Sequence, residues 1–125
     1  MVGIDDRYKG LLDSESTREE RRMLEQFSGV DSLVIAEEAL ALYRLTMVVP
    51  SGSSVLEIGS YRGGSTVAIG HAAIQRDLRL FCIDKWAAYH DQSDFINFDR
   101  KHLDDMRILG EFIRNTDFIK ERLCM

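Results

Sequence analysis

The chain has 125 residues, of which 45% are apolar and 30% are charged, close to the averages of globular domains. This length suits one domain, or part of one, and is enough to bury a real core. The net charge of −5 lacks the positive surplus that binding to nucleic acid requires. No apolar run is long enough to span a membrane, so we expect neither a nucleic-acid nor a membrane partner.

The first twenty residues are dense in charge and contain no apolar stretch of secretory-signal length. Cys82 and Cys124 are too few for a disulfide framework, and Cys82 lies inside an apolar run. Two buried or free thiols fit a reducing compartment, so we expect a cytoplasmic protein.

Residues 1–50 predict an N-terminal helical segment that follows an exposed arm over 1–15. Hydroxyl residues three positions before Glu19 and Glu20 predict a capping box and a helix to about residue 27. We expect this helix to end near Gly29 in the left-handed conformation. A second helix, capped by Asp31 or Ser32, should run to about residue 45. Its predicted apolar stripe is Leu33, Ala36, Leu40, Tyr43 and Met47.

Residues 51–125 predict a βαβ unit that begins after a turn cluster over 50–53. The run 54–58 is short, apolar and β-branched, as expected of a buried parallel strand. A glycine loop follows, then a helix over about 65–76 and a second strand over 78–83 that ends at Asp84. Strand, loop, helix and strand in this order predict an α/β fold with a Rossmann-like parallel sheet nucleus.

After Trp86 we expect a polar loop and then a long helix. Residues with spacings of three and four predict its apolar stripe: Phe95, Phe98, His102, Met106, Leu109 and Ile113. A turn is expected over 115–117, and residues 118–125 could begin a third strand.

The loop after the first strand is the candidate ligand site. Glycines let the backbone approach a ligand, and the following helix start offers free amide groups and a partial positive charge. Asp84 lies 25 positions past Gly59, roughly where a dinucleotide fold places the acid that binds ribose hydroxyls. Glu57 repels a pyrophosphate and attracts an ammonium group. Tyr61 breaks the dinucleotide fingerprint and Ser65 replaces the lysine of a P-loop, so both alternatives are disfavoured.

The segments Glu57–Thr66 (EIGSYRGGST) and Cys82–Trp86 (CIDKW) resemble the first two motifs of class I S-adenosylmethionine-dependent methyltransferases. The resemblance implies that the glycine loop cradles the cofactor and that Glu57 holds its methionine amino end. It also implies that Asp84 binds the ribose hydroxyls and that Lys85 or Trp86 lies near the adenine. The expected cofactor-binding residues are Glu57, Gly59, Ser60, Tyr61, Gly63, Gly64, Ser65, Asp84, Lys85 and Trp86.

A complete domain of that family has seven strands, and its later strands carry the acceptor contacts. This chain ends soon after the second strand, so we expect an incomplete methyltransferase fold and assign no catalytic residue. The expected function is that of an S-adenosylmethionine-dependent methyltransferase or its cofactor-binding half. The alternative is a non-catalytic, oligomerising interaction protein, because a few strands leave edges and apolar stripes exposed. We expect a homo-oligomer, formed through the 95–113 helix, or a missing C-terminal half.

Several side chains near the loop have a simpler structural role available. Tyr61 and Arg62 are expected at the loop tip, facing solvent, and Ser65 and Thr66 as a helix cap. Trp86 suits packing and an adenine contact equally well. His71 and His90 have no partners at metal-ligand spacing, so we expect no metal.

Overall fold

The structure is a computed structural model that describes residues 15–86 and 98–125. The predicted N-terminal arm, except for Glu15, and the polar loop with His90 and Phe95 lie outside the described residues. The elements follow one another as α2 (Arg18–Ser28), α3 (Ala36–Met47), β1 (Ser54–Ile58), α4 (Gly64–Arg76), β2 (Arg79–Ile83), α5 (Phe98–Asn115), the 3-10 helix η2 (Asp117–Ile119) and β3 (Leu123–Cys124).

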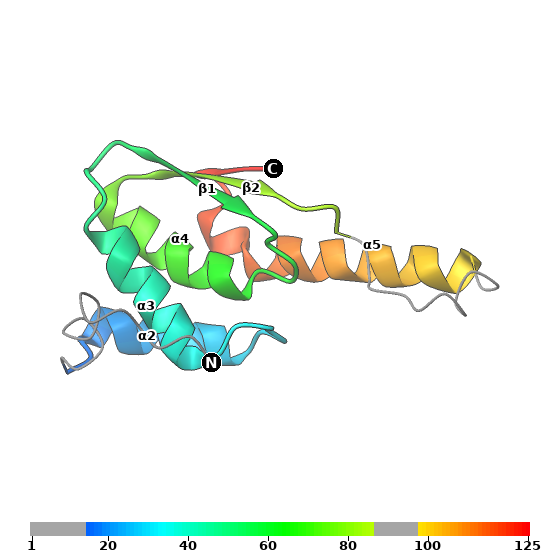
Figure 1. The fold of residues 1–125 in the computed structure, drawn as a ribbon, viewed down its shortest axis with the longest axis horizontal. Coiled ribbons are helices and arrows are strands. Elements are labelled where there is room, and N and C mark those ends of the chain that lie inside the picture. Colours follow the sequence, from blue (N-terminus) through cyan, green and yellow to red (C-terminus); the bar gives the residue numbers. More distant parts are fainter. Residues whose placement is uncertain (1–14, 87–97) are drawn as a thin grey trace, which may run out of the picture.

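The strands form a parallel sheet in the order β1-β2-β3, so the predicted α/β fold with a parallel sheet nucleus is confirmed. Helices α4 and α5 lie against one face of this sheet, and α2 and α3 form a further layer beneath α4 (Figure 1). The predicted third strand is present but comprises two residues. No described helix is long and apolar enough to cross a membrane.

Helix α2 begins as its sequence predicts. The Thr17 hydroxyl accepts a hydrogen bond from the Glu20 amide, and the Glu20 carboxylate accepts one from the Thr17 amide. Such a capping box satisfies two amide groups that the first turn leaves unpaired. The helix ends at Ser28, next to Gly29, as predicted. The predicted left-handed conformation is wrong, because Gly29 has φ −84° and its amide donates to the Gln26 carbonyl in a right-handed conformation.

The predicted start and stripe of the second helix are wrong in part. Helix α3 starts four residues later than Ser32, and the Glu38 carboxylate accepts the Ile35 amide there. Ser32 instead caps a local turn by accepting from the Val34 amide. Leu33 therefore precedes the helix and is exposed, whereas Tyr43 is buried as predicted.

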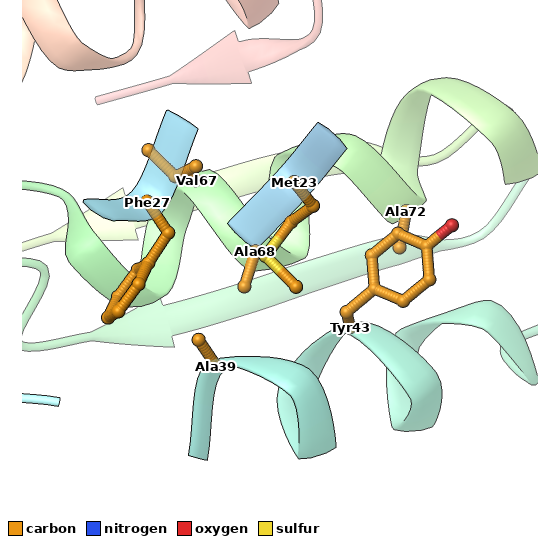
Figure 2. Packing of buried hydrophobic residues seen from close by; sticks show 7 residues of the cluster. All are labelled: Met23, Phe27, Ala39, Tyr43, Val67, Ala68 and Ala72. Atoms are coloured by element: carbon orange, nitrogen blue, oxygen red, sulfur yellow. The ribbon is translucent and has the colours of Figure 1, made fainter. Parts of the chain in front are cut away.

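The first hydrophobic cluster joins the N-terminal helices to α4. Met23 and Phe27 of α2 and Tyr43 of α3 enclose small side chains on α4 (Figure 2). Because Ala68 and Ala72 are short, the three helices approach closely and exclude water from the space between them.

The second cluster lies between α4 and the sheet. Leu80 and Cys82 point from β2 toward Ile69 of α4, Phe112 of α5 and Ile119 of η2. Alternation then turns the neighbouring strand residues to the opposite face. That face is exposed, and it carries Leu56, Ile58, Phe81 and Ile83.

Helix α5 buries a different face from the predicted one. Ile108 and Phe112 are buried, whereas Met106 and Ile113 of the predicted stripe are exposed. The two sets are both spaced for one helix face, and contact with the sheet selects Ile108 and Phe112. The predicted stripe also contains His102, whose side chain is not among those that the structure describes.

A buried ion pair links α2 to α3. The Arg44 Nε lies 2.5 Å from Glu20 Oε2, and both side chains are less than a tenth exposed. In a buried pair, the attraction between the two charges mainly offsets the cost of removing both of them from water, and it adds little net stability. It therefore fixes how the two helices meet, because either charge alone would be strongly unfavourable.

His71 of α4 provides a test of this packing by pH. Its ring nitrogen Nε2 lies 2.7 Å from Gln26 Oε1, its ring contacts Phe118, and burial lowers its pKa below the ordinary 6.5. Because the unfolded chain then binds the proton more readily, the contribution of neutral His71 to the free energy of unfolding is fully present above pH 6.5. This contribution is lost as the pH falls toward the lower pKa of the folded state. Urea unfolding between pH 7 and pH 5 should show a smaller loss of stability for His71→Gln than for the parent. An identical pH slope in both proteins would contradict this account.

Candidate functional site

The glycine loop lies at the carboxyl end of the sheet, between β1 and α4. Glu57 pairs in register with Cys82, and the Gly59 amide donates to the Ile83 carbonyl over 2.8 Å. Asp84 follows directly after Ile83 on the neighbouring strand. The structure therefore brings Glu57 and Asp84 to the same end of two adjacent strands, where open parallel sheets bind ligands.

Asp84 holds the loop by its main chain. Its Oδ2 accepts a hydrogen bond from the Tyr61 amide and its Oδ1 accepts one from the Trp86 amide, each over 2.7 Å. Tyr61 and Trp86 have φ of 50° and 45°, in the left-handed region that non-glycine residues rarely adopt. The amides of both strained residues donate to one carboxylate, so the surrounding structure holds the backbone in a conformation that it would otherwise rarely adopt. Such strained residues are common at functional sites.

Glu57 binds the start of α4 through side chains. Its Oε2 accepts from the Ser65 hydroxyl over 2.7 Å, and its Oε1 accepts from the Thr66 hydroxyl over 2.5 Å. The prediction that Ser65 and Thr66 cap the helix is wrong, because Gly63 is the N-cap and offers no side-chain hydrogen bond. The first-turn amides of α4 therefore receive no side-chain cap, while an acidic group lies beside them.

Each of the three loop glycines is required for a different structural reason. Gly59 has φ +87° and open space where a Cβ would be, so its backbone is accessible to a ligand. Gly63 has φ +92° and packs against Phe112 and Thr116. A Cβ on Gly64 would lie 2.6 Å from the Ser32 Cβ and closer still to its hydroxyl, so Gly64 permits close packing.

Ser60 points inward rather than toward solvent. Its hydroxyl is buried without a well-formed hydrogen bond and lies beside the Cys82 thiol, a weak partner. The Cys82 Sγ also lies 3.9 Å from Glu57 Oε1. Of the expected contacts of Ser60 with a cofactor, only those through its main chain fit this arrangement.

Tyr61 and Arg62 are half-buried, so the prediction that they face solvent at a loop tip is wrong. Arg62 forms ion pairs with Asp31, before α3, and with Glu111 of α5 at 2.6 Å. Its carbonyl accepts from the Asn115 side chain over 2.9 Å. Sequence reasoning missed these partners because they lie far from Arg62 along the chain, with no local motif to indicate them.

Trp86 closes the side of the loop nearest α5. Its indole Nε1 donates to the Tyr61 carbonyl over 3.1 Å, and its ring packs on Phe112 with centroids 5.0 Å apart. Packing is therefore established for Trp86, while its predicted adenine contact stays a prediction. Lys85 is exposed beside it.

Within residues 15–86 and 98–125, no group of three His, Cys, Asp or Glu side chains is arranged to hold a metal ion. A surface hollow formed by Gly52, Asp77 and Arg122 lies at the opposite, amino end of the strands. In the part of the chain that the structure describes, the loop around Glu57 and Asp84 is thus the candidate site. Its carboxylates and main-chain groups are of the kind that can bind a molecule that carries a positive charge and hydroxyl groups.

The sequence matches no model of a known protein family, and a search of curated proteins finds no match either.

The packing role of Gly64 predicts a paired effect with Ser32. Gly64→Ala should destabilise the fold by about 1–3 kcal/mol through overpacking, measured by urea unfolding. Adding Ser32→Gly removes the clashing atoms, so the double variant should be more stable than the sum of the single effects predicts. Gly110→Ala is the matched control, because nothing lies within 4 Å of a Cβ there. Additive effects of the two substitutions would rule out this contact.

The two thiols should differ in reactivity. Burial raises the pKa of Cys82 to about 11, whereas Cys124 is exposed and both are free. Because the thiolate is the nucleophile, iodoacetamide at pH 8 should label Cys124 and leave Cys82 unmodified until the protein unfolds. Mass spectrometry of the labelled peptides measures this, and rapid labelling of Cys82 in the folded protein would disagree with its burial.

Proposed function

We propose that the glycine loop binds S-adenosylmethionine and that the chain is the cofactor-binding part of a methyltransferase. The observation that carries the proposal is the position of Glu57 and Asp84 on either side of this loop, at the carboxyl ends of adjacent parallel strands. The motif resemblance supports the same cofactor, and the three-stranded sheet with one uncovered face suits part of such a domain.

The acceptor groups of the two carboxylates match the donors of this cofactor. Each Asp84 oxygen accepts one main-chain amide, which leaves further lone pairs for the two hydroxyls of a ribose. Glu57 similarly retains acceptor capacity beyond the Ser65 and Thr66 hydroxyls for an ammonium group. The positive charges of the amino and sulfonium groups favour this acidic end of the sheet.

When bound, the cofactor supplies an electrophilic methyl group, so the organic chemistry belongs to it. The residues of this chain bind and orient the cofactor. Asp84 would hold the ribose while it keeps the Tyr61 and Trp86 amides in place, and Glu57 would hold the amino end beside the first turn of α4. The exposed backbone at Gly59 would lie against the cofactor between them.

Calorimetric titration with S-adenosylhomocysteine and S-adenosylmethionine tests the proposal. We expect one bound cofactor per chain, and a loss of affinity of about 10- to 100-fold for Asp84→Asn and for Glu57→Gln, because each removes a charge-assisted hydrogen bond. The matched controls Asp117→Asn and Glu121→Gln change exposed acids near β3 and should bind like the parent. NAD should not compete.

Circular dichroism and thermal unfolding of each variant separate lost binding from lost folding. Absence of heat with the folded parent, or equal affinity of the parent and both site variants, would contradict the proposal.

The uncovered sheet face favours a second candidate function, that of an oligomerising interaction protein without catalysis. The titration separates the two candidates. A folded chain that associates with itself but binds no cofactor would favour the second.

A further inference from the structure

The glycine loop carries a positive charge of its own. Arg62 is the only basic residue of the segment Glu57–Thr66, which the proposed function assigns to a ligand that is itself a cation. A positive charge in such a loop opposes a cationic ligand, because like charges repel most strongly where little solvent separates them. The partners of the Arg62 guanidinium therefore bear on which ligand the loop can bind.

Two carboxylates from outside the loop pair with the Arg62 guanidinium. Glu111 Oε2 of α5 lies 2.6 Å from Arg62 Nε, and the two side chains are only 17% and 20% exposed, respectively. The Asp31 carboxylate also pairs with Arg62, but it is 80% exposed, so water and salt screen its charge. Glu111 is therefore the partner that neutralises most of the charge of Arg62.

Charge rather than alignment holds Arg62 and Glu111 together. The Arg62 Nε and Glu111 Oε2 atoms are both buried, and within the described residues neither makes an aligned hydrogen bond. The attraction between opposite charges does not require such alignment. A substitution that removes the charge of Glu111 but keeps its shape should therefore remove what this contact contributes.

The same turns of α5 also hold the main chain of the loop. The Asn115 side chain donates to the Arg62 carbonyl over 2.9 Å, and a Cβ on Gly63 would lie 3.3 Å from Phe112. Figure 1 shows the loop between β1 and α4 beside this part of α5. Helix α5 thus supports the loop from behind through side-chain and main-chain contacts at one place.

We propose that Glu111 is a positioning residue of the glycine-loop site, which fixes Arg62 and cancels its charge so that the loop accepts a cationic ligand. This inference rests on the proposed function and adds to it a part for α5 in the choice of ligand. S-adenosylmethionine carries a positive sulfonium, whereas S-adenosylhomocysteine lacks that charge. An Arg62 that Glu111 does not neutralise would oppose the first ligand more than the second.

Calorimetric titration with both ligands tests the charge-cancelling role through the ratio of their affinities. Glu111→Gln should weaken S-adenosylmethionine severalfold more than S-adenosylhomocysteine. Arg62→Met combined with Glu111→Gln removes both charges, so the ratio should return to that of the parent. A loop that is merely loosened would bind both ligands more weakly by the same factor, and the ratio would not change in any variant.

Two further variants make this titration decisive. Arg62→Met alone should shift the ratio in the opposite direction, which provides the test even where Glu111→Gln fails to fold. Arg107→Gln is the matched control, because it removes the other cation near Glu111, which lies 3.3 Å away and is 71% exposed, and leaves the Arg62 pair intact. It should bind both ligands like the parent.

The fluorescence of Trp86 tests the positioning role in the chain without a ligand. Trp86 is the only tryptophan, and its indole donates to the carbonyl of Tyr61, the residue before Arg62. Glu111→Gln should increase the quenching of Trp86 by acrylamide, because the loop is held less firmly, and Arg107→Gln should not. Circular dichroism of each variant separates this effect from unfolding.

The outcomes separate this inference from the proposed function. An unchanged affinity ratio in Glu111→Gln and in Arg62→Met, with both ligands bound, would overturn the inference and leave the proposed function standing. A parent that binds neither ligand would overturn the proposed function and the part of Glu111 in ligand choice with it. Unchanged quenching of Trp86 in folded Glu111→Gln would overturn the positioning of the loop by Glu111.

Discussion

The carboxylate of Asp84 is the interaction on which the loop end of the molecule depends. It accepts the amides of Tyr61 and Trp86, and both of these residues adopt left-handed backbone conformations. Each such conformation costs about 1–2 kcal/mol, and a hydrogen bond to a charged group returns a similar amount. The loop therefore keeps a backbone conformation that its own residues disfavour. Asp84, which directly follows the next strand along the chain, stabilises this conformation.

Glu57 performs the matching task on the other side of the loop. By accepting the Ser65 and Thr66 hydroxyls, it ties the end of β1 to the first turn of α4. The two acids that sequence reasoning selected as ligand contacts are thus also the residues that build the site. A structural role and a binding role are compatible here, because each carboxylate oxygen can accept more than one hydrogen bond.

The features predicted correctly depend on neighbours in the chain. Short-range spacing predicts the capping box at Thr17 and the βαβ order. It also places Glu57 and Asp84 together at the carboxyl ends of two adjacent strands. The errors arise where distant partners decide. Asp31 leaves its predicted cap position and pairs with Arg62 instead, 31 residues away. Helix α5 holds two apolar stripes of equally good period, and contact with the sheet selects the one that contains Phe112.

Helix α4 lies between the sheet and the N-terminal helices and is almost enclosed. Its glycines and alanines set the spacing of both layers: a Cβ on Gly70 would lie 2.7 Å from an Ile119 side-chain carbon, as Gly64 is confined by Ser32. A larger side chain at either glycine would therefore force the neighbouring layer to move. Related chains should keep small residues along α4 even where their outer helices have diverged beyond alignment.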